Sequence, residues 1–283
     1  MIKGAIMNYH QLIDGIKKYK SSETDICLHC LGVMPEQINT NVVIAPWWEP
    51  KSLALLGDAE YLSESQFSAI KVWNIKSEIC DITYIKTGIG APVFMDALLA
   101  LGVTKCKNII FVGSVGSLDE DIGIGDIVIP QYSICGDGAS RYIASDTLKI
   151  KDVFGTKVEP DKNIFDVMCR ITEKVCNKNN VKFHIGRAFS IDSVFAQYAH
   201  IDEILNMGCN VIEMETASAF RAAQIANLKL AAIFSVSDNT VTNKSLISGR
   251  TENDMKYRRF VRNNLFPEII TKVFSEMSTE NDF

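Results

Sequence analysis

Apolar and polar positions along the chain follow two alternating patterns, one typical of buried strands and the other of helices. Short apolar or alternating runs predict strands at residues 41–45, 70–75, 81–86, 108–112, 122–130, 181–190, 211–214 and 228–239. Amphipathic or alanine-rich segments predict helices at residues 1–20, 92–101, 163–177 and 201–207, and from about residues 51, 216 and 252. Since strands and helices alternate without an internal repeat, we expect a single α/β domain around a central, largely buried sheet.

The two ends of the chain are predicted to be helical. We treat residues 1–40 as an N-terminal helical extension and residues 41–283 as the main domain. Pro267 is expected to interrupt or kink the last helix, because proline lacks the backbone N–H that a helix interior requires. The same helix carries four basic residues that we expect to face solvent: Lys256, Arg258, Arg259 and Arg262.

Composition narrows the possible functions. The 283 residues are 47% hydrophobic and carry a formal net charge of -5, with no basic tract of the kind that binds nucleic acid and no apolar run that spans a membrane. The N-terminal segment lacks the apolar stretch and cleavage site of a signal peptide, so we expect a cytoplasmic protein that binds small molecules. The eight cysteines are scattered, and the single pair Cys27 and Cys30 lacks the second pair of a zinc site, so we expect no bound metal.

Two acidic residues, Glu213 and Glu215, lie in an otherwise apolar strand-to-helix segment. Such junctions lie at the carboxyl edge of an α/β sheet, where ligands bind, and paired carboxylates suit a vicinal diol such as that of ribose. The alternative is that Glu213 points to solvent while Glu215 favours the helix dipole. A second polar group, Ser237-Asp238-Asn239, follows another buried strand and favours the ligand-binding interpretation.

A dinucleotide-binding site is disfavoured, because Gly88-Ile-Gly90 is followed by Val93 where the third glycine of that motif is required. The chain instead resembles the family of nucleoside phosphorylases and nucleosidases, which includes purine nucleoside phosphorylases, uridine phosphorylases and methylthioadenosine/adenosylhomocysteine nucleosidases. The resemblance rests on five motifs in order: Gly88-Ile-Gly90, Val112-Gly113-Ser114-Val-Gly116, Gly125-Asp126-Ile-Val, Val211-Ile-Glu213-Met214-Glu215 and Ser237-Asp238-Asn239.

This resemblance implies a three-layer α/β fold, with a twisted central mixed β-sheet flanked by helices. It also implies a homo-oligomer built from dimers, with a trimer of dimers as one form. The implied reaction is cleavage of the bond between ribose and base, with no cofactor other than inorganic phosphate as co-substrate. The partners expected on this basis are a nucleoside and phosphate.

The resemblance assigns roles at both ends of the nucleoside. Glu215 would hold the ribose hydroxyls, with Met214 packed against the sugar and Glu213 beside them. Asp238 would be the general acid that protonates the departing base, since burial can raise the pKa of an aspartate enough to carry that proton. The remaining residues expected at the base are Val194, Phe195 and Ser237. Because relatives that resemble uridine phosphorylase lack this aspartate, a purine base is favoured, although Gln197 lies near the place of their glutamine.

The phosphate side departs from the phosphorylase pattern. Trp47 and Lys51 stand in place of a glycine and an arginine, and Phe111 stands in place of a second arginine. Four residues remain as the expected anion site: Lys51, Gly90, Ser114 and Arg250. Arg141, Arg187 or a residue of a neighbouring subunit are the further candidates to replace the lost charge.

Two alternatives to phosphorolysis follow from this departure. Glu49 lies close to the place where nucleosidases carry a glutamate that activates water, and a carboxylate there suits a general base, although it can equally be an exposed loop acid. In the other alternative, Trp47 and Trp48 fill the phosphate cavity of a protein that binds nucleosides without turnover. Phosphorolysis is the leading hypothesis.

Overall fold

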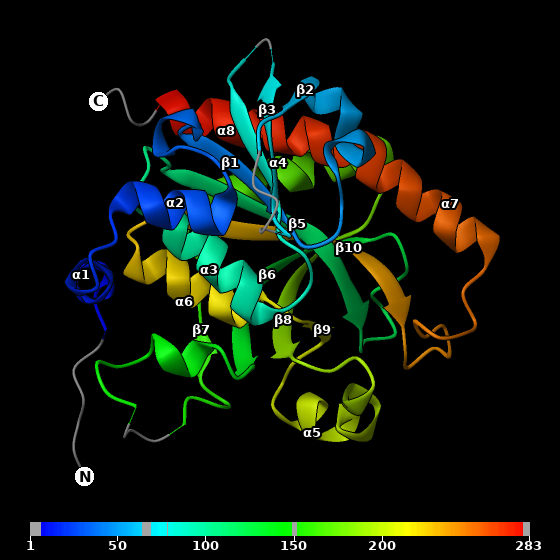
Figure 1. Cartoon of the computed structure of the whole chain (residues 1–283). Helices are drawn as coiled ribbons and strands as arrows, with labels where there is room; N and C mark the ends of the chain where they lie inside the picture. Colours follow the sequence, from blue (N-terminus) through cyan, green and yellow to red (C-terminus); the bar gives the residue numbers. More distant parts are fainter. Residues whose placement is uncertain (1–6, 64–68, 78, 149–151, 280–283) are drawn as a thin grey trace.

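The computed structural model describes residues 7–63, 69–77, 79–148 and 152–279. The strands are β1 (Asn41–Ala45), β2 (Asp58–Tyr61), β3 (Lys71–Lys76), β4 (Ile82–Lys86), β5 (Asn108–Ser117), β6 (Ile127–Gly136), β7 (Lys157–Val158), β8 (Phe183–Ile191), β9 (Val211–Glu213) and β10 (Lys229–Asn239). The α-helices are α1 (Tyr9–Lys18), α2 (Glu23–Leu31), α3 (Ala91–Leu101), α4 (Lys162–Asn179), α5 (Ile201–Asn206), α6 (Thr216–Ile225), α7 (Glu252–Phe260) and α8 (Phe266–Thr279) (Figure 1).

The strands form one mixed sheet, and part of it closes on itself. β5 pairs in parallel with β1 and with β10; β10 also pairs with β6, β6 with β8, β8 with β9, and β9 returns to β5. These five strands make a closed ring, from which β1, β4, β3 and β2 extend as an open sheet. The predicted mixed sheet is confirmed, and its closure is an additional feature that local sequence patterns do not carry.

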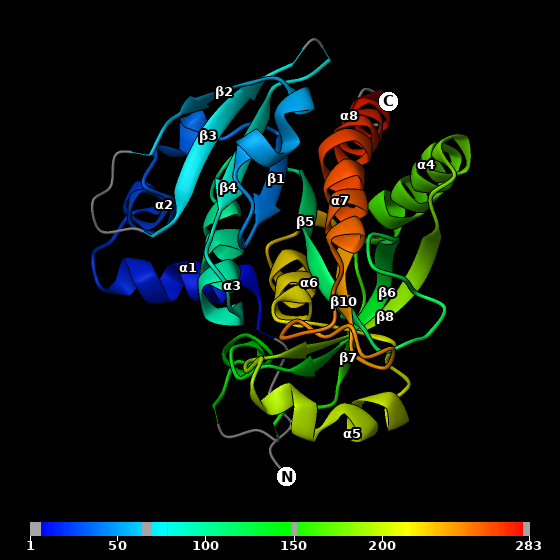
Figure 2. The same ribbon diagram turned by 90° about the vertical axis from the view of Figure 1, so that its right-hand side faces the viewer.

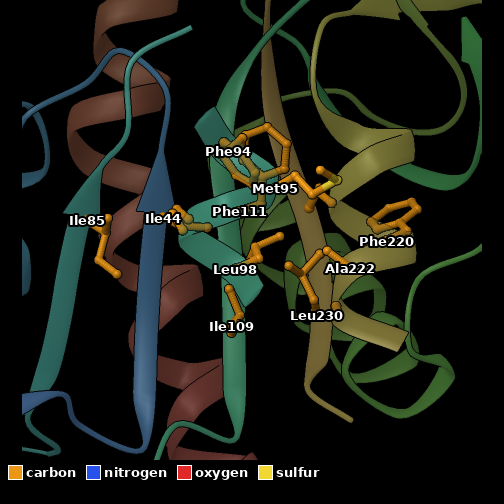
Figure 3. Packing of buried hydrophobic residues seen from close by; sticks show 14 of the residues in the cluster. Ile44, Ile85, Phe94, Met95, Leu98, Ile109, Phe111, Phe220, Ala222 and Leu230 are labelled. Carbon is orange, nitrogen blue, oxygen red and sulfur yellow. The ribbon is translucent and has the colours of Figure 1, made fainter. Parts of the chain in front are cut away.

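Helices cover both faces of the sheet, which confirms the predicted three layers. On one face α2, α3 and α6 pack against β1, β4, β5 and β10, and on the other α4 and α8 pack against the same sheet (Figure 2). In the first layer Phe94 of α3 lies 4.4 Å from Phe111 of β5, and Phe111 lies 4.9 Å from Phe234 of β10 (ring centroids). Figure 3 shows α3, α6 and the strands meeting in this apolar cluster.

Phe111 is therefore a core residue with 1% of its surface exposed. Its ring fills the space between α3 and β10, so the side chain at position 111 packs in the core of this protein.

The elements that were not predicted include α2 and β2. Residues 21–25 lack apolar periodicity, yet Ser22 caps α2 by accepting from the Asp25 N–H while the Asp25 carboxylate accepts from the Ser22 N–H, a capping box. β2 has four exposed residues and no alternating pattern, and it exists because it pairs with β3.

The predicted interruption of the last helix lies just before Pro267. α7 and α8 are joined by a π-helical turn, Val261–Leu265, which accommodates the proline near the start of α8. Within the part of the chain that the structure describes, no helix is both long enough and apolar enough to cross a membrane.

Candidate active site

A cavity of about 350 Å³ lies where β5, β9 and β10 end. Its walls bring together residues that are up to 216 positions apart, from Pro46 to Arg262. The lining residues are Pro46, Trp47, Trp48, Ile89, Gly113, Ser114, Gly116, Val194, Gln197, Ile212, Glu213, Met214, Glu215, Ser237, Asp238, Leu246, Arg250, Arg258 and Arg262. Glu215 and Asp238, the two acids on which the ligand-binding interpretation depends, thus lie in one pocket.

Glu213 is buried and its carboxylate is occupied by the protein itself. One oxygen accepts a hydrogen bond from Ser190 Oγ, and the other accepts from the backbone N–H groups of Glu215 at 2.6 Å and Thr216 at 2.7 Å. These bonds fix the turn from β9 into α6. The alternative in which Glu213 points to solvent is wrong.

Glu215 is also buried, and its Oε1 accepts a hydrogen bond from the Gly90 N–H at 2.7 Å. Burial, and secondly the charge of Glu213, raises the pKa of Glu215 to about 8. Gly90 itself has a φ of +116°, a conformation that favours glycine, and it does not line the cavity. Its contribution is to hold Glu215.

Asp238 is 2% exposed and lies at a bulge of β10. The register shifts between Val236 and Asp238, so the two consecutive side chains of Ser237 and Asp238 both reach the cavity. Ser237 Oγ lies 2.5 Å from Asp238 Oδ1 as a donor. Burial raises the pKa of Asp238, and the hydrogen bond from Ser237 opposes that shift in part.

Three arginines also line the cavity, and two of them correct the prediction that they face solvent. Arg258 and Arg262, expected on a solvated face, line the cavity together with Arg250. Arg258 Nη2 donates to Ser114 Oγ at 2.5 Å. Burial, followed by the charges of Arg262 and Arg250, lowers the pKa of Arg258 to about 10. Of the predicted basic run, Lys256 and Arg259 do face solvent.

The only sequence signal for this pair is their spacing, which groups them on one side of a helix without showing that this side faces the cavity. Arg258 and Arg262 are four residues apart across the α7 end, so they project from one side of the helix. Gly125 makes room for that helix: a Cβ at this glycine would lie 2.4 Å from the ring of Tyr257, the residue before Arg258.

Trp48 also belongs to the cavity wall. Its side chain is buried against Phe266, with ring centroids 5.8 Å apart, and the guanidinium carbons of Arg258 and Arg262 lie 6.0 and 5.5 Å from its ring centroid. Trp47 is largely exposed at the cavity edge, where Lys86 Nζ lies 5.7 Å from its ring centroid. The two tryptophans line the cavity and leave its volume open.

Several predicted site residues lie outside the lining. Glu49 forms ion pairs with Lys86 at 3.0 Å and Lys51 at 3.2 Å, and hydrogen bonding to Lys86 and then Lys51 lowers the pKa of Glu49. Lys51 is mostly exposed. Phe195, expected at the base, is 91% exposed, whereas its neighbour Val194 lines the cavity.

The other arginines considered for the anion site are engaged elsewhere. Arg141 pairs with Asp152, and Arg187 Nε donates to the carbonyl of Gly208 at 2.6 Å. Gln197, in contrast, is buried and lines the cavity. Over the described ranges, no three His, Cys, Asp or Glu residues are grouped so that they could hold a metal ion.

The cavity beside the closed ring of strands thus combines buried acids from two strand ends with three arginines, a lining suited to a polar ligand. Residues 51–262 match the phosphorylase superfamily, and the chain belongs to this family. The predicted family and fold are thereby confirmed.

Proteins similar in sequence to this chain include several named as nucleoside phosphorylases. A guanosine phosphorylase from Halorubrum lacusprofundi is 24% identical over 189 residues, 66% of this chain and 72% of its own length. A uridine phosphorylase from Thermococcus kodakarensis is 26% identical over 186 residues, 60% of this chain and 62% of its own length. A purine nucleoside phosphorylase of the DeoD type from Bacillus velezensis is 23% identical over 55% of this chain and 63% of its own length.

The fold is also that of a solved phosphorylase. The crystal structure of uridine phosphorylase from Vibrio fischeri superimposes with a TM-score of 0.69 at 20% sequence identity, covering 89% of this chain and 97% of that one. The predicted enzyme class, a pentosyltransferase of the nucleoside phosphorylase type, agrees with these relatives.

Proposed function

We propose that the protein cleaves the N-glycosidic bond of a purine nucleoside by phosphorolysis, releasing the base and ribose 1-phosphate. The observation that carries the proposal is that Glu215 and Asp238, from two separate strand ends, line the same cavity as three arginines. Inorganic phosphate would be the co-substrate, and the reaction needs no other cofactor. The expected homo-oligomer is part of the same proposal.

At the sugar end, Glu215 is the acceptor for the ribose diol. Its Oε1 is held by Gly90, which fixes the carboxylate in the cavity wall while further lone pairs stay available. A pKa near 8 means that most of the population is protonated at neutral pH in the unliganded protein. Two hydroxyl donors would favour the ionised form, so binding of the diol releases a proton.

At the base end, Asp238 supplies a proton. A phosphate oxygen forms a bond to C1′ of the ribose as the bond between C1′ and the base nitrogen breaks, and the electron pair of that bond passes to the base. The proton from Asp238 neutralises the base at its ring nitrogen. The raised pKa keeps this carboxyl group protonated to a higher pH than an exposed aspartate. The Gln197 amide, which can both donate and accept, is available to bind the edge of the base.

The position of Glu49 favours phosphorolysis over hydrolysis. A general base that activates water needs contact with that water and a pKa near the working pH. Glu49 does not line the cavity, and two lysines lower the pKa of its carboxyl group. The open cavity beside Trp47 and Trp48 likewise favours an enzyme over a binding protein without turnover.

Incubation with nucleosides in the presence and absence of phosphate tests the proposal. Inosine, guanosine, adenosine, methylthioadenosine and uridine are the substrates to compare, and the sugar product is identified by chromatography. We expect ribose 1-phosphate from a purine nucleoside only when phosphate is present. Free ribose or methylthioribose formed without phosphate would establish hydrolysis, and nucleoside binding without any product would establish a binding protein.

A further inference from the structure

Two arginines in the cavity wall carry a charge that is not matched by an ion pair among the described residues. Arg258 and Arg262 form no ion pair with a carboxylate in the part of the chain that the structure describes. Arg258 gives one hydrogen bond, to Ser114, and its Nε is buried without a hydrogen-bond partner. Arg262 Nε donates to the side chain of Asn263, its neighbour in the chain.

Such an arrangement is unfavourable in the absence of a ligand. A buried cation costs free energy unless an anion accompanies it, and a buried donor without a partner costs more. The acids of the same cavity compensate this charge only in part, because Asp238 acts on Arg258 electrostatically without forming an ion pair with it. Glu213 is already occupied by three donors, and Asp238 makes its hydrogen bond with Ser237.

Trp48 positions the two guanidinium groups. It approaches both of them with its ring and is itself held against Phe266 of α8. A cation over an aromatic face keeps its N–H groups, which lie in the guanidinium plane, available for other acceptors. A pair of guanidinium groups with free N–H donors matches the oxygens of a tetrahedral oxyanion, to which arginine binds through two parallel hydrogen bonds.

We propose that Arg258 and Arg262, together with the hydroxyl of Ser114, form a binding site for a phosphoryl oxyanion, and that Trp48 holds both arginines toward it. The site is built by the α7 end and the π-helical turn, far along the chain from the predicted Lys51 and Gly90. Its ligand is either free phosphate or the phosphate group of a nucleotide. The assignment to free phosphate rests on the proposed phosphorolysis.

Binding of inorganic phosphate in the absence of nucleoside tests the site directly. Isothermal titration calorimetry on the full chain compares the wild type with Arg258→Met, Arg262→Met and the double variant. Arg259→Met is the matched control, because Arg259 is on the same helix but faces solvent outside the cavity. We expect each substitution in the pair to raise the Kd for phosphate about tenfold or more, and the control to stay within about twofold.

Thermal unfolding without ligand separates this role from a structural one. If Arg258 and Arg262 form an anion site that is empty in the unliganded protein, Arg258→Met removes a buried charge that has no ion-pair partner. The Tm of this variant without phosphate should then equal or exceed that of the wild type. Phosphate at a concentration that saturates the wild type should then raise the Tm of the wild type by more than that of the variant. A variant with a lower Tm without phosphate and an unchanged Kd would overturn the proposal.

A parallel titration with guanosine 5′-monophosphate identifies the source of the oxyanion. Tighter binding of the nucleotide than of phosphate, lost in the double variant, assigns the site to the phosphate of a nucleotide and supports it. If the wild type binds phosphate through the arginine pair but cleaves no nucleoside, this site stands and the proposed function fails. If phosphate-dependent cleavage persists with an unchanged phosphate KM in the double variant, the proposed function stands and this site fails.

Discussion

At the scale of single residues, the neighbouring acids Glu213 and Glu215 show how hydrogen-bond saturation assigns different roles to equally buried side chains. Three donors occupy the two oxygens of Glu213, which therefore shapes the β9–α6 turn. Glu215 accepts at one oxygen from Gly90 and keeps capacity for a ligand. The sequence predicts both acids at a strand end, but only their hydrogen bonds in the folded chain show which of them remains available to bind a ligand.

The raised pKa of Glu215 predicts a pH-dependent stability that a neutral side chain should remove. An acid with an ordinary pKa of 4.5 in the unfolded chain and about 8 in the folded one holds its proton longer when folded. Its contribution to stability is therefore present below about pH 4.5 and is lost as the pH rises through 8. Glu215→Gln keeps the acceptor for the Gly90 N–H and has no such loss.

We expect this variant to match the Tm of the wild type at pH 5 and to exceed it by several degrees at pH 9, at roughly 2–4 °C per kcal/mol. Thermal unfolding followed by circular dichroism across this range is the measurement. Glu120→Gln, an exposed loop position, is the control and should follow the wild type at every pH. Parallel Tm profiles for Glu215→Gln and wild type would show that Glu215 is ionised in the folded protein at neutral pH.

Asp238 gives a prediction about catalysis. In Asp238→Asn the amide oxygen can still accept from Ser237 Oγ, but the side chain has no proton to give. We expect kcat for a purine nucleoside to fall by about 10²–10⁴, the usual contribution of a general acid, with nucleoside affinity changed little. Steady-state kinetics and calorimetry measure the two quantities. Asp202→Asn, on the exposed surface of α5, is the control. Unchanged turnover in Asp238→Asn would remove the acid role.

At the scale of secondary-structure elements, buried strands and long amphipathic helices were predictable and contact-dependent elements were not. The apolar run of β1 and the helix α4 carry their own periodicity, and both were predicted close to their observed bounds. β2 and α2 form because of a partner strand and a capping box, respectively. The same limit applies to the site: the acids and Arg250 are predictable from the sequence, whereas Arg258 and Arg262 were expected to face solvent.

The prediction that Arg258 faces solvent was wrong for a physical reason. Four basic residues within seven positions are usually solvated, and helical periodicity alone does not reveal which face meets a tertiary neighbour. The neighbour here is the turn at Gly125, which lies against Tyr257. Only the packing of α7 onto this turn directs Arg258 inward.

We therefore expect a side chain at position 125 to displace α7. Its φ is +91°, and an added Cβ would lie 2.4 Å from Tyr257 Cδ1 and 3.2 Å from the Arg258 backbone nitrogen. We expect Gly125→Ala to lower the free energy of unfolding by about 2–4 kcal/mol, through strain at positive φ and displacement of the helix. Chemical denaturation measures this change.

The control for Gly125→Ala isolates backbone strain from crowding. Gly155 has a φ of +77° in an exposed loop, and a Cβ there would meet nothing within 4 Å. Gly155→Ala should cost only the strain, about 1 kcal/mol. Equal losses in the two variants would mean that α7 tolerates a side chain at position 125 without moving.

At the scale of the whole molecule, the closed ring of strands is what joins distant parts of the sequence at one cavity. β5 pairs with both β9 and β10, so Ser114 of β5 meets Glu215 and Asp238, although both acids come more than 100 positions later in the chain. Strand order is set by pairing between segments that are far apart, which a linear pattern does not encode. The sequence could therefore predict the sheet but not its closure.

Residues 7–40 share the core of the main domain, and this predicts that the N-terminal segment is required for folding. Leu31, Val33 and Ile38 are buried in the same apolar cluster as α3, and the carbonyl of Thr40 accepts from the backbone N–H groups of Lys107 and Asn108. Each large apolar side chain removed from a core costs about 2–5 kcal/mol, against a total stability of about 5–15 kcal/mol. A chain that begins at residue 41 should thus fail to unfold cooperatively and should aggregate.

A shorter truncation separates the two parts of this segment. A chain that begins at residue 21 loses α1, whose Tyr9 hydroxyl donates to the Leu99 carbonyl at 2.5 Å and whose Ile13 is buried, but keeps α2 and its cap. We expect this chain to fold with a Tm lowered by roughly 5–15 °C, since fewer buried side chains are lost. Circular dichroism and size-exclusion chromatography of both truncated chains provide the measurement. Cooperative unfolding of the chain from residue 41 at the wild-type Tm would instead show that the first 40 residues are an independent extension, because their apolar contacts would then contribute nothing to the stability of the main domain.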